Sequence, residues 1–244
     1  MTRMLVTRPE PDAHRTLRRL RALDIEATAA PLMTRVAIGT PLPPPEQFAA
    51  LAVTSANALR ALADRGAIEA YRHLPVYAVG TRTAFEAEAR GFGTVHNANG
   101  ALGDLAELLV HGGINGRVLH LSGRHVAGDL ARSVAEHGVS VETVPIYVMA
   151  PVESLPEAVI AGLEAGGFAA ALFYSRRTAE IFVQLMGERL TPSIRSGVEM
   201  LCLSETVAEP LIHANCVRIS LADRPDDGAM MTLALAFARE QNGA

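Results

Sequence analysis

Lysine is absent from this chain, and all 22 basic residues are arginine. Schiff-base catalysis, attachment of pyridoxal phosphate and the phosphate-binding Walker motif each need a lysine ammonium. Arginine cannot replace it there, because the guanidinium does not lose its proton. The absence therefore excludes these classes of enzyme. Arginine is well suited to bind carboxylates and phosphates through its planar group.

Cysteine is scarce, and no metal-binding pattern is present. Cys202 and Cys216 fall in apolar runs with no metal-type spacing, so we expect both to be buried thiols. The eight histidines show no H-E-x-x-H or related spacing. We therefore expect no metal, and we interpret His120 and His125 as structural or surface residues.

Long hydrophobic runs are also missing. None approaches the roughly 18 residues that a membrane helix needs, and residues 1–9 lack the apolar segment of a signal peptide. The composition, 49% hydrophobic and 20% charged with a net charge of −4, predicts one large or two small globular domains. We expect a cytoplasmic monomer that binds neither membrane nor nucleic acid.

Common catalytic signatures do not occur. No G-x-G-x-x-G follows a strand-like run, and no G-x-S-x-G elbow is present. We expect no cofactor. An enzyme with this sequence would act mainly by positioning its substrate and by charge complementarity.

Short apolar runs alternate with amphipathic segments along most of the chain, a pattern typical of α/β folds. Asp12 is expected to cap the first helix. The segment 35–48 holds four closely spaced prolines and is expected to be a connection. Expected strands are residues 4–7, 25–32, 49–54, 76–79, 118–121, 139–148, 170–174, 200–203 and 217–220, with a further short strand from Val95.

A strand–turn–helix stretch at 76–90 returns in weaker form at 200–211. The repeat extends further, because Val53 matches Phe173, Val79 matches Leu203 and Leu102 matches Met230 in the same order. The separations are 120, 124 and 128 residues and grow evenly, as loop insertions would produce. The pattern indicates an internal duplication.

The duplication predicts two doubly wound, flavodoxin-like parallel-sheet domains, one inserted in the other. Residues 1–35 with 150–244 are expected to form the discontinuous domain, because neither part alone makes a complete sheet. Residues 38–146 form the inserted domain. Segments 34–37 and 146–149 are expected to cross between them as a two-segment β linker that serves as a hinge.

Turns after the predicted strands are rich in hydroxyl groups and arginines, and ligands of doubly wound sheets bind at these carboxyl ends. Free helix-end amides there suit anionic groups. The alternatives are that the hydroxyls only cap helices and that the arginines form ordinary ion pairs. The candidate binding residues are Arg8, Ser55, Arg82, Thr83, Ser122, Gly123, Arg124, Ser175, Arg176, Ser204 and Thr206.

Short motifs spread over almost the whole chain resemble the uroporphyrinogen-III synthase family. Their order across two interrupted α/β domains carries the resemblance. They are residues 5–9 (LVTRP), 53–57 (VTSAN), 78–84 (AVGTRTA), 121–123 (LSG), 128–130 (GDL), 144–147 (VPIY), 173–175 (FYS) and 203–208 (LSETVA).

The resemblance implies a cofactor-independent lyase of tetrapyrrole biosynthesis. Its substrate would be hydroxymethylbilane, a polycarboxylate that loses water and closes to uroporphyrinogen III with ring D inverted. The upstream bilane-forming enzyme is a candidate partner. Tyr147 matches the family's linker tyrosine and would donate a proton to the leaving hydroxyl. Glu205 departs from the family's small residue or proline, and we expect its carboxylate to point away from the anionic substrate.

Two other readings stay open. A bilobed binding or sensor protein for a polyanionic small molecule would share the hinge and the arginine-lined cleft. A flavodoxin or receiver domain would share the strand pattern. A receiver, however, needs a lysine, which this chain lacks.

Overall fold

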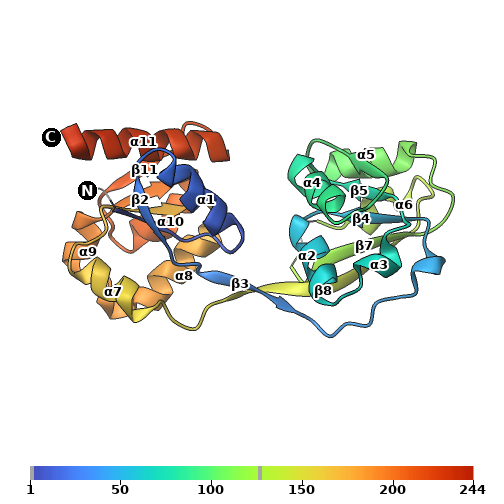
Figure 1. Cartoon of the computed structure of the whole chain (residues 1–244), viewed down its shortest axis with the longest axis horizontal. Helices are drawn as coiled ribbons and strands as arrows, with labels where there is room; N and C mark the ends of the chain where they lie inside the picture. The colour runs from blue at the N-terminus through green and yellow to red at the C-terminus, as the bar shows by residue number, and fades with distance from the viewer. Residues whose placement is uncertain (1–2, 126–127, 244) are drawn as a thin grey trace. The chain divides into compact units, whose positions relative to one another are not determined.

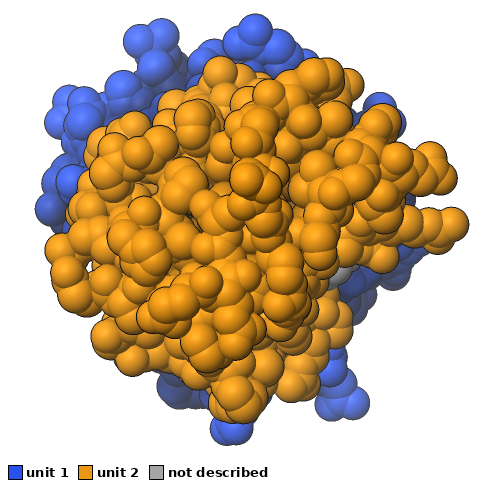
Figure 2. Space-filling view, turned by 90° about the vertical axis from the view of Figure 1, so that its right-hand side faces the viewer, with its two compact units in different colours: residues 1–34, 150–244 blue, residues 35–149 orange. Residues whose placement is uncertain are grey.

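The computed structural model describes residues 3–125 and 128–243. The chain divides into two compact units (Figure 2), unit 1 with residues 1–34 and 150–244 and unit 2 with residues 35–149. Each unit is built on one sheet with helices packed on it (Figure 1). This confirms the expected class of two α/β domains with mostly parallel sheets. No helix within the described ranges is long and apolar enough to cross a membrane.

Unit 1 contains a five-stranded parallel sheet with the order β11-β10-β9-β1-β2. The central β9 is apolar along its length and fully buried, as expected for a strand covered on both faces. The strands are β1 (Arg3–Val6), β2 (Glu26–Ala29), β9 (Ala170–Phe173), β10 (Glu199–Cys202) and β11 (Ile219–Leu221).

Helices cover both faces of this sheet. On one face, Leu20 of α1 and Phe237 of α11 pack into a core with Met4. On the other face, Phe173 meets Phe182 of α8, with ring centroids 5.2 Å apart. The helices of unit 1 are α1 (Asp12–Arg21), α7 (Glu157–Glu164), α8 (Arg176–Met186), η2 (Gly187–Arg189), α9 (Pro192–Gly197), α10 (Glu205–His213) and α11 (Asp227–Gly243).

Unit 2 contains a six-stranded sheet with the order β3-β8-β7-β4-β5-β6. From β8 to β6 every pairing is parallel. The strands are β3 (Met33–Ala37), β4 (Ala50–Val53), β5 (Val76–Ala78), β6 (Val95–Asn97), β7 (Val118–Gly123) and β8 (Val141–Pro151).

The two faces of the unit 2 sheet carry separate apolar cores. One is filled by α2, α3 and α4 against Leu51 and Leu121. The other is filled by α5 and α6 against Ala52 and Val118. The helices are η1 (Pro45–Gln47), α2 (Ala56–Asp64), α3 (Ile68–Tyr71), α4 (Thr81–Ala89), α5 (Leu102–His111) and α6 (Leu130–Ala135).

Each sheet has one point at which the order of its strands reverses. In unit 2 the chain runs outward from β4 through β5 to β6 and then returns to the other side of β4 as β7. In unit 1 the reversal lies between β1 and β9. Doubly wound sheets bind ligands at the carboxyl ends of the strands where the order reverses. We therefore expect ligand-binding residues directly after β4 and β7 in unit 2, and directly after β1 and β9 in unit 1.

Two of the three matched pairs in the predicted repeat stand at equivalent places in the two sheets. In unit 2, Val53 pairs with Ala78, one residue before Val79. In unit 1, Phe173 pairs with Cys202, one residue before Leu203. The matched residues thus stand at equivalent positions of two parallel strand pairs, β4–β5 and β9–β10.

One boundary was wrong: the connection expected at 35–48 begins later, because residues 35–37 belong to β3, whose neighbour in the sheet is β8. This strand pair corresponds to the expected two-segment β linker. Ile38 N donates to Ile146 O at 3.1 Å and Val152 N to Leu32 O at 3.1 Å, so these two crossing strands run antiparallel. The prolines begin only at Pro41, after the strand has ended, which the prediction overlooked.

The start of the first helix also differs from the prediction. Pro11, not Asp12, occupies the N-cap position, and Asp12 is the first helical residue. Its carboxylate lies 3.8 Å from Arg15 one turn along the same helix. A carboxylate is stabilised in a first turn as well as at the cap, because both lie near the positive end of the helix dipole. This is why the sequence signal was misplaced by one residue.

Candidate functional site

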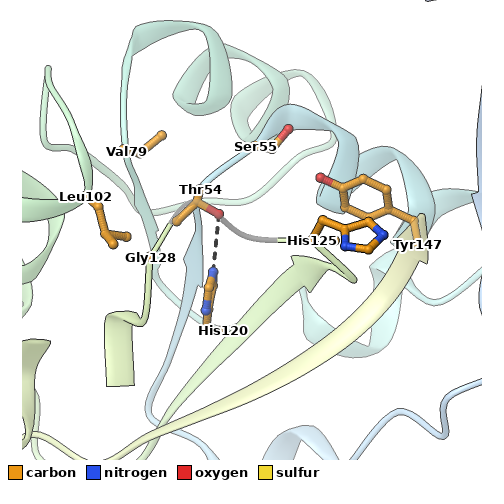
Figure 3. Close-up of a pocket in the computed structure, with 9 residues that line it drawn as sticks. Thr54, Ser55, Val79, Leu102, His120, His125, Gly128 and Tyr147 are labelled. Atoms are coloured by element: carbon orange, nitrogen blue, oxygen red, sulfur yellow. Dashed lines mark hydrogen bonds between the residues drawn. The ribbon is translucent and has the colours of Figure 1, made fainter. Parts of the chain in front are cut away.

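A pocket of about 260 Å³ lies in unit 2, where the carboxyl ends of β4 and β7 meet. This is the place where the strand order of the sheet reverses. Figure 3 shows the side chains around it. The lining residues are Thr54, Ser55, Val79, Leu102, His120, Gly123, His125, Gly128 and Tyr147.

A β-bulge in β8 brings Tyr147 to this pocket. Ser122 pairs with Pro145, but the next residue, Gly123, pairs with Tyr147, so Ile146 is the extra residue. The backbone amide of Arg124 donates to Tyr147 O at 2.8 Å and holds the strand beyond the bulge. Bulges redirect side chains next to binding sites. Here the bulge lets Ile146 and Tyr147 join the same apolar core although they are consecutive in the strand.

Tyr147 is 7% exposed, and its hydroxyl points toward the side of the pocket formed by Thr54 and Ser55 (Figure 3). Gly123 makes this placement possible. A Cβ added to Gly123 would lie 3.0 Å from Tyr147 Cζ and 3.1 Å from the hydroxyl oxygen. The absent side chain is therefore what lets the phenol lie against the end of β7.

Replacing Gly123 by Ala is expected to displace the Tyr147 ring by a few tenths of an ångström. If the ring acts on substrate, turnover should fall about fivefold, because small misplacements of reacting groups are costly. Stability should fall by about 1 kcal/mol from overpacking. Gly103→Ala is the matched control, since its added Cβ meets nothing within 4 Å. Steady-state kinetics and urea unfolding check both variants. Unchanged turnover of Gly123→Ala would contradict the expectation.

A row of three polar side chains crosses the neighbouring strands β4, β7 and β8. His120 Nε2 lies 3.3 Å from Thr54 Oγ1, and His120 Nδ1 lies 3.1 Å from Thr143 Oγ1 (Figure 3 shows the first contact). His120 pairs with Thr143 in β8 and with Ala52 in β4, two residues before Thr54. All three side chains therefore stand on one face of the sheet.

His120 is buried to 1% exposure. Burial lowers the pKa of its imidazole to about 4, and the nearby carboxylate of Asp129 opposes the shift only in part. The ring is therefore neutral at pH 7. A neutral imidazole has one donor and one acceptor nitrogen, so it binds one threonine as donor and the other as acceptor.

Several predicted binding residues begin helices, and two of them are N-caps as the alternative reading expected. Ser55 Oγ accepts from Asn57 N at 3.2 Å, and Ser175 Oγ accepts from Thr178 N at 3.2 Å. Gly80 and Ser204, at the same position before α4 and α10, give no side-chain cap. Their first-turn amides are left without a side-chain acceptor, which suits an anionic ligand.

The remaining predicted residues of unit 2 differ in exposure. Thr83 and Ser122 are buried, at 5% and 2% exposure, in α4 and at the end of β7. Arg82, in the first turn of α4, and Arg124, just after β7, are exposed. The structure thus brings Ser55, Gly123 and Tyr147 together on one pocket. Arg82 and Arg124 are exposed residues of the same unit and are not part of its lining.

In unit 1, Arg8 is engaged inside the domain. Its Nη1 donates to Asp227 Oδ1 at 2.6 Å, and its guanidinium carbon lies 4.0 Å from the centre of the Tyr174 ring. Burial raises the pKa of the Tyr174 phenol, and the Arg8 charge partly opposes this. Asp227 is the first residue of α11, so Arg8 ties that helix to the carboxyl end of β1.

Arg176 is likewise paired. It donates to Glu180 Oε1 at 2.9 Å and also bonds Glu209 of α10. Ser204 is half-buried, and Thr206 and Glu205 are exposed at the start of α10. Arg8 and Arg176 therefore form ion pairs within unit 1, as the alternative interpretation of these arginines expected.

No metal centre is found in the parts of the chain that the structure covers, which hold no group of three or more His, Cys, Asp or Glu side chains close enough for an ion. Cys202 and Cys216 are buried thiols, as expected.

The sequence places Thr54 in a polar turn after a strand but does not single it out as a binding residue, and it favours structural or surface roles for His120 and His125. All three line the pocket. The available signal was strand register: Thr54 follows a buried run by one residue, and His120 lies within the next central strand. Which strands are neighbours in the sheet could not be known from spacing alone.

Comparison with known proteins connects this architecture to one enzyme family. A family model described as Uroporphyrinogen-III synthase HemD matches residues 14–232. The uroporphyrinogen-III synthetase structure of Helicobacter pylori 26695 is similar at 18% identity, with TM-score 0.65, over 97% of this chain and 99% of that one. A mutant synthase of Thermus thermophilus is similar at 16% identity, with TM-score 0.52, over 98% and 100% of the chains. The search of curated proteins gave no match.

Proposed function

The chain belongs to the uroporphyrinogen-III synthase family, and on that premise we propose that the pocket of unit 2, with Tyr147 on its wall, is where ring closure occurs. The enzyme is a cyclising lyase of tetrapyrrole biosynthesis. It converts hydroxymethylbilane, with loss of water, into uroporphyrinogen III. The single observation that carries the proposed site is the bulge that places the Tyr147 hydroxyl on a pocket at the reversal of strand order.

Tyr147 acts in this proposal as the general acid. Its phenol donates a proton to the hydroxyl group of the substrate, which leaves as water. The resulting cationic azafulvene is attacked by the substituted carbon of ring D, and the spiro intermediate opens and closes again with the ring inverted. The proton that the final rearomatisation releases returns to the phenolate. Each step conserves charge without a cofactor.

Uncapped helix starts would hold the carboxylates of the substrate. The first turns of α4 and α10 offer amides that no side chain caps, and the helix dipoles favour negative charge there. Arg82 and Arg124, which are exposed, are the arginines of the predicted set that we assign to carboxylates. Arg8 and Arg176 would first have to leave Asp227, Glu180 and Glu209.

Ser55, Thr83, Ser122, Gly123, Ser175, Ser204 and Thr206 complete the proposed binding set. Ser55 and Gly123 line the pocket directly. We also infer that the enzyme works in the cytoplasm as a monomer and accepts its substrate from the upstream bilane-forming enzyme. Ser55 Oγ already accepts one backbone hydrogen bond, and its O–H remains available to donate to a substrate carboxylate. Ser175 Oγ accepts from Thr178 N and also contacts the Thr178 hydroxyl.

The decisive assay uses freshly prepared hydroxymethylbilane and separates the two uroporphyrinogen isomers by chromatography. The enzyme is expected to give isomer III, whereas the substrate alone closes to isomer I. This comparison contains its own control, because both reactions consume the same substrate. Formation of isomer I alone would favour the non-catalytic binding or sensor protein, which no observation in the structure favours now.

A further inference from the structure

Thr54 lines the pocket, and the hydrogen-bonding partner of its hydroxyl is a buried histidine. Thr54 follows β4 directly, half-buried, with its Oγ1 3.3 Å from His120 Nε2. Its neighbour Ser55 is committed to capping α2 through Asn57 N. Of these two consecutive hydroxyls, that of Thr54 is therefore the one that contacts a buried histidine side chain, His120 (Figure 3).

The histidine is itself fixed on its far side. His120 Nδ1 lies 3.1 Å from Thr143 Oγ1, and His120 and Thr143 are register partners in β7 and β8. The ring therefore has a hydroxyl next to each nitrogen, and its strand is paired on both sides. A neutral imidazole offers one donor and one acceptor. Whether the Thr54 hydroxyl donates to the ring or accepts from it therefore determines whether that hydroxyl can donate a hydrogen bond to a ligand or only accept one.

We propose that His120 is a positioning residue for the cyclisation, and that its imidazole, held by Thr143, orients the Thr54 hydroxyl for a hydrogen bond to the pyrrole substrate. This rests on the proposed site at the pocket. His120 is 1% exposed and does not itself touch substrate in this role. It acts through Thr54, which contacts the ring nitrogen or a carboxylate of the substrate. A fixed hydroxyl loses no freedom when substrate binds, which is the advantage of the arrangement.

Two amide substitutions separate the contacts of the ring. In His120→Gln the terminal amide reaches the position of Nε2 and can keep the bond to Thr54. In His120→Asn the shorter amide matches Nδ1 and keeps only the bond to Thr143. We expect His120→Asn to lower kcat/KM about tenfold, the value of one hydrogen bond, and His120→Gln to restore most of it. His111→Asn, at the exposed end of α5, is the matched control and should keep full activity.

A double-mutant cycle then tests whether His120 acts through Thr54. Thr54→Val replaces the hydroxyl with a methyl group and should also cost about tenfold. The double variant with His120→Asn should lose about tenfold in total and not a hundredfold, because both changes remove the same interaction. A merely structural histidine would give losses that multiply. That outcome, or a His120→Gln variant as impaired as His120→Asn, overturns the proposal.

An NMR measurement, which does not depend on enzyme activity, tests the inference if His120→Asn does not fold. In protein labelled with ¹⁵N-histidine, Thr54→Val should shift the Nε2 resonance of His120, and Thr143→Val should shift Nδ1. Unmoved resonances would show that the ring does not bind these hydroxyls. The isomer assay on the wild-type enzyme is independent of these two tests. If isomer III does not form, the proposed function fails. If isomer III forms but the losses of the two single variants multiply in the double variant, only the role of His120 is removed.

Discussion

Replacing Tyr147 by Phe is expected to lower kcat by at least about 100-fold, the usual contribution of a general acid. The ring itself should stay in place, because it is 7% exposed and packs in the core with Ile146. The change removes only the hydroxyl, for which the described part of the chain provides no hydrogen-bond partner. KM should change little, since the proton is transferred in the transition state. Stopped-flow or steady-state kinetics with fresh hydroxymethylbilane measures both constants.

Tyr77→Phe is the matched control for this substitution. Tyr77 is a buried tyrosine of the same unit, stacked on His96 with centroids 4.6 Å apart, and it does not line the pocket. It should keep near-normal turnover. Wild-type kcat in Tyr147→Phe would remove Tyr147 from the acid role. An equal loss in Tyr77→Phe would show that the loss comes from damage to the fold.

Acidification is expected to destabilise the protein through His120 by about 3 kcal/mol between pH 6.5 and pH 4. Burial lowers the folded-state pKa of this histidine to about 4, whereas the unfolded chain titrates near 6.5. Between these values the unfolded state binds a proton that the folded state does not. The stabilisation is therefore complete above pH 6.5, decreases as the pH falls, and is lost below about pH 4.

Urea unfolding from pH 5 to pH 7.5 isolates this effect. The carboxyls with lowered pKa, such as Glu157 and Glu164 beside Arg189, lose their contribution only below their ordinary pKa of 4.5. Across the window the wild type should lose about 2 kcal/mol. His120→Gln, which cannot titrate, should give a flatter profile. Parallel profiles for the two proteins would rule out a strongly shifted His120.

Much of the fold followed from local patterns. Apolar runs such as 50–53 and 170–173 are too short for helices and lie before capping residues, so their strands were evident. The repeat of Val53 at Phe173 and of Val79 at Leu203 indicated the duplicated block, which the structure contains as two equivalent parallel strand pairs. Strand ends were less certain, because residues at the end of a strand and in the next turn share similar polarity.

The bulge at Ile146 is the feature that spacing could not reveal. In a regular strand Tyr147 would face the same side as Thr143, away from Ile146. One extra residue opposite Gly123 reverses this and places the phenol on the pocket. A bulge leaves no mark in the pattern of apolar residues, because it depends on how two strands pair.

The sequence by itself determined the chemistry available to this protein: arginines without lysine, polar turns after buried strands, and a tyrosine within the second crossing segment. Those properties are local, and they are readable from residue type and period. Only the tertiary structure decided which groups are engaged and which meet. It paired Arg8 with Asp227, 219 residues away, and set Thr54 beside His120 across two strands. Such pairings depend on the order of strands in the sheet, which no local pattern encodes.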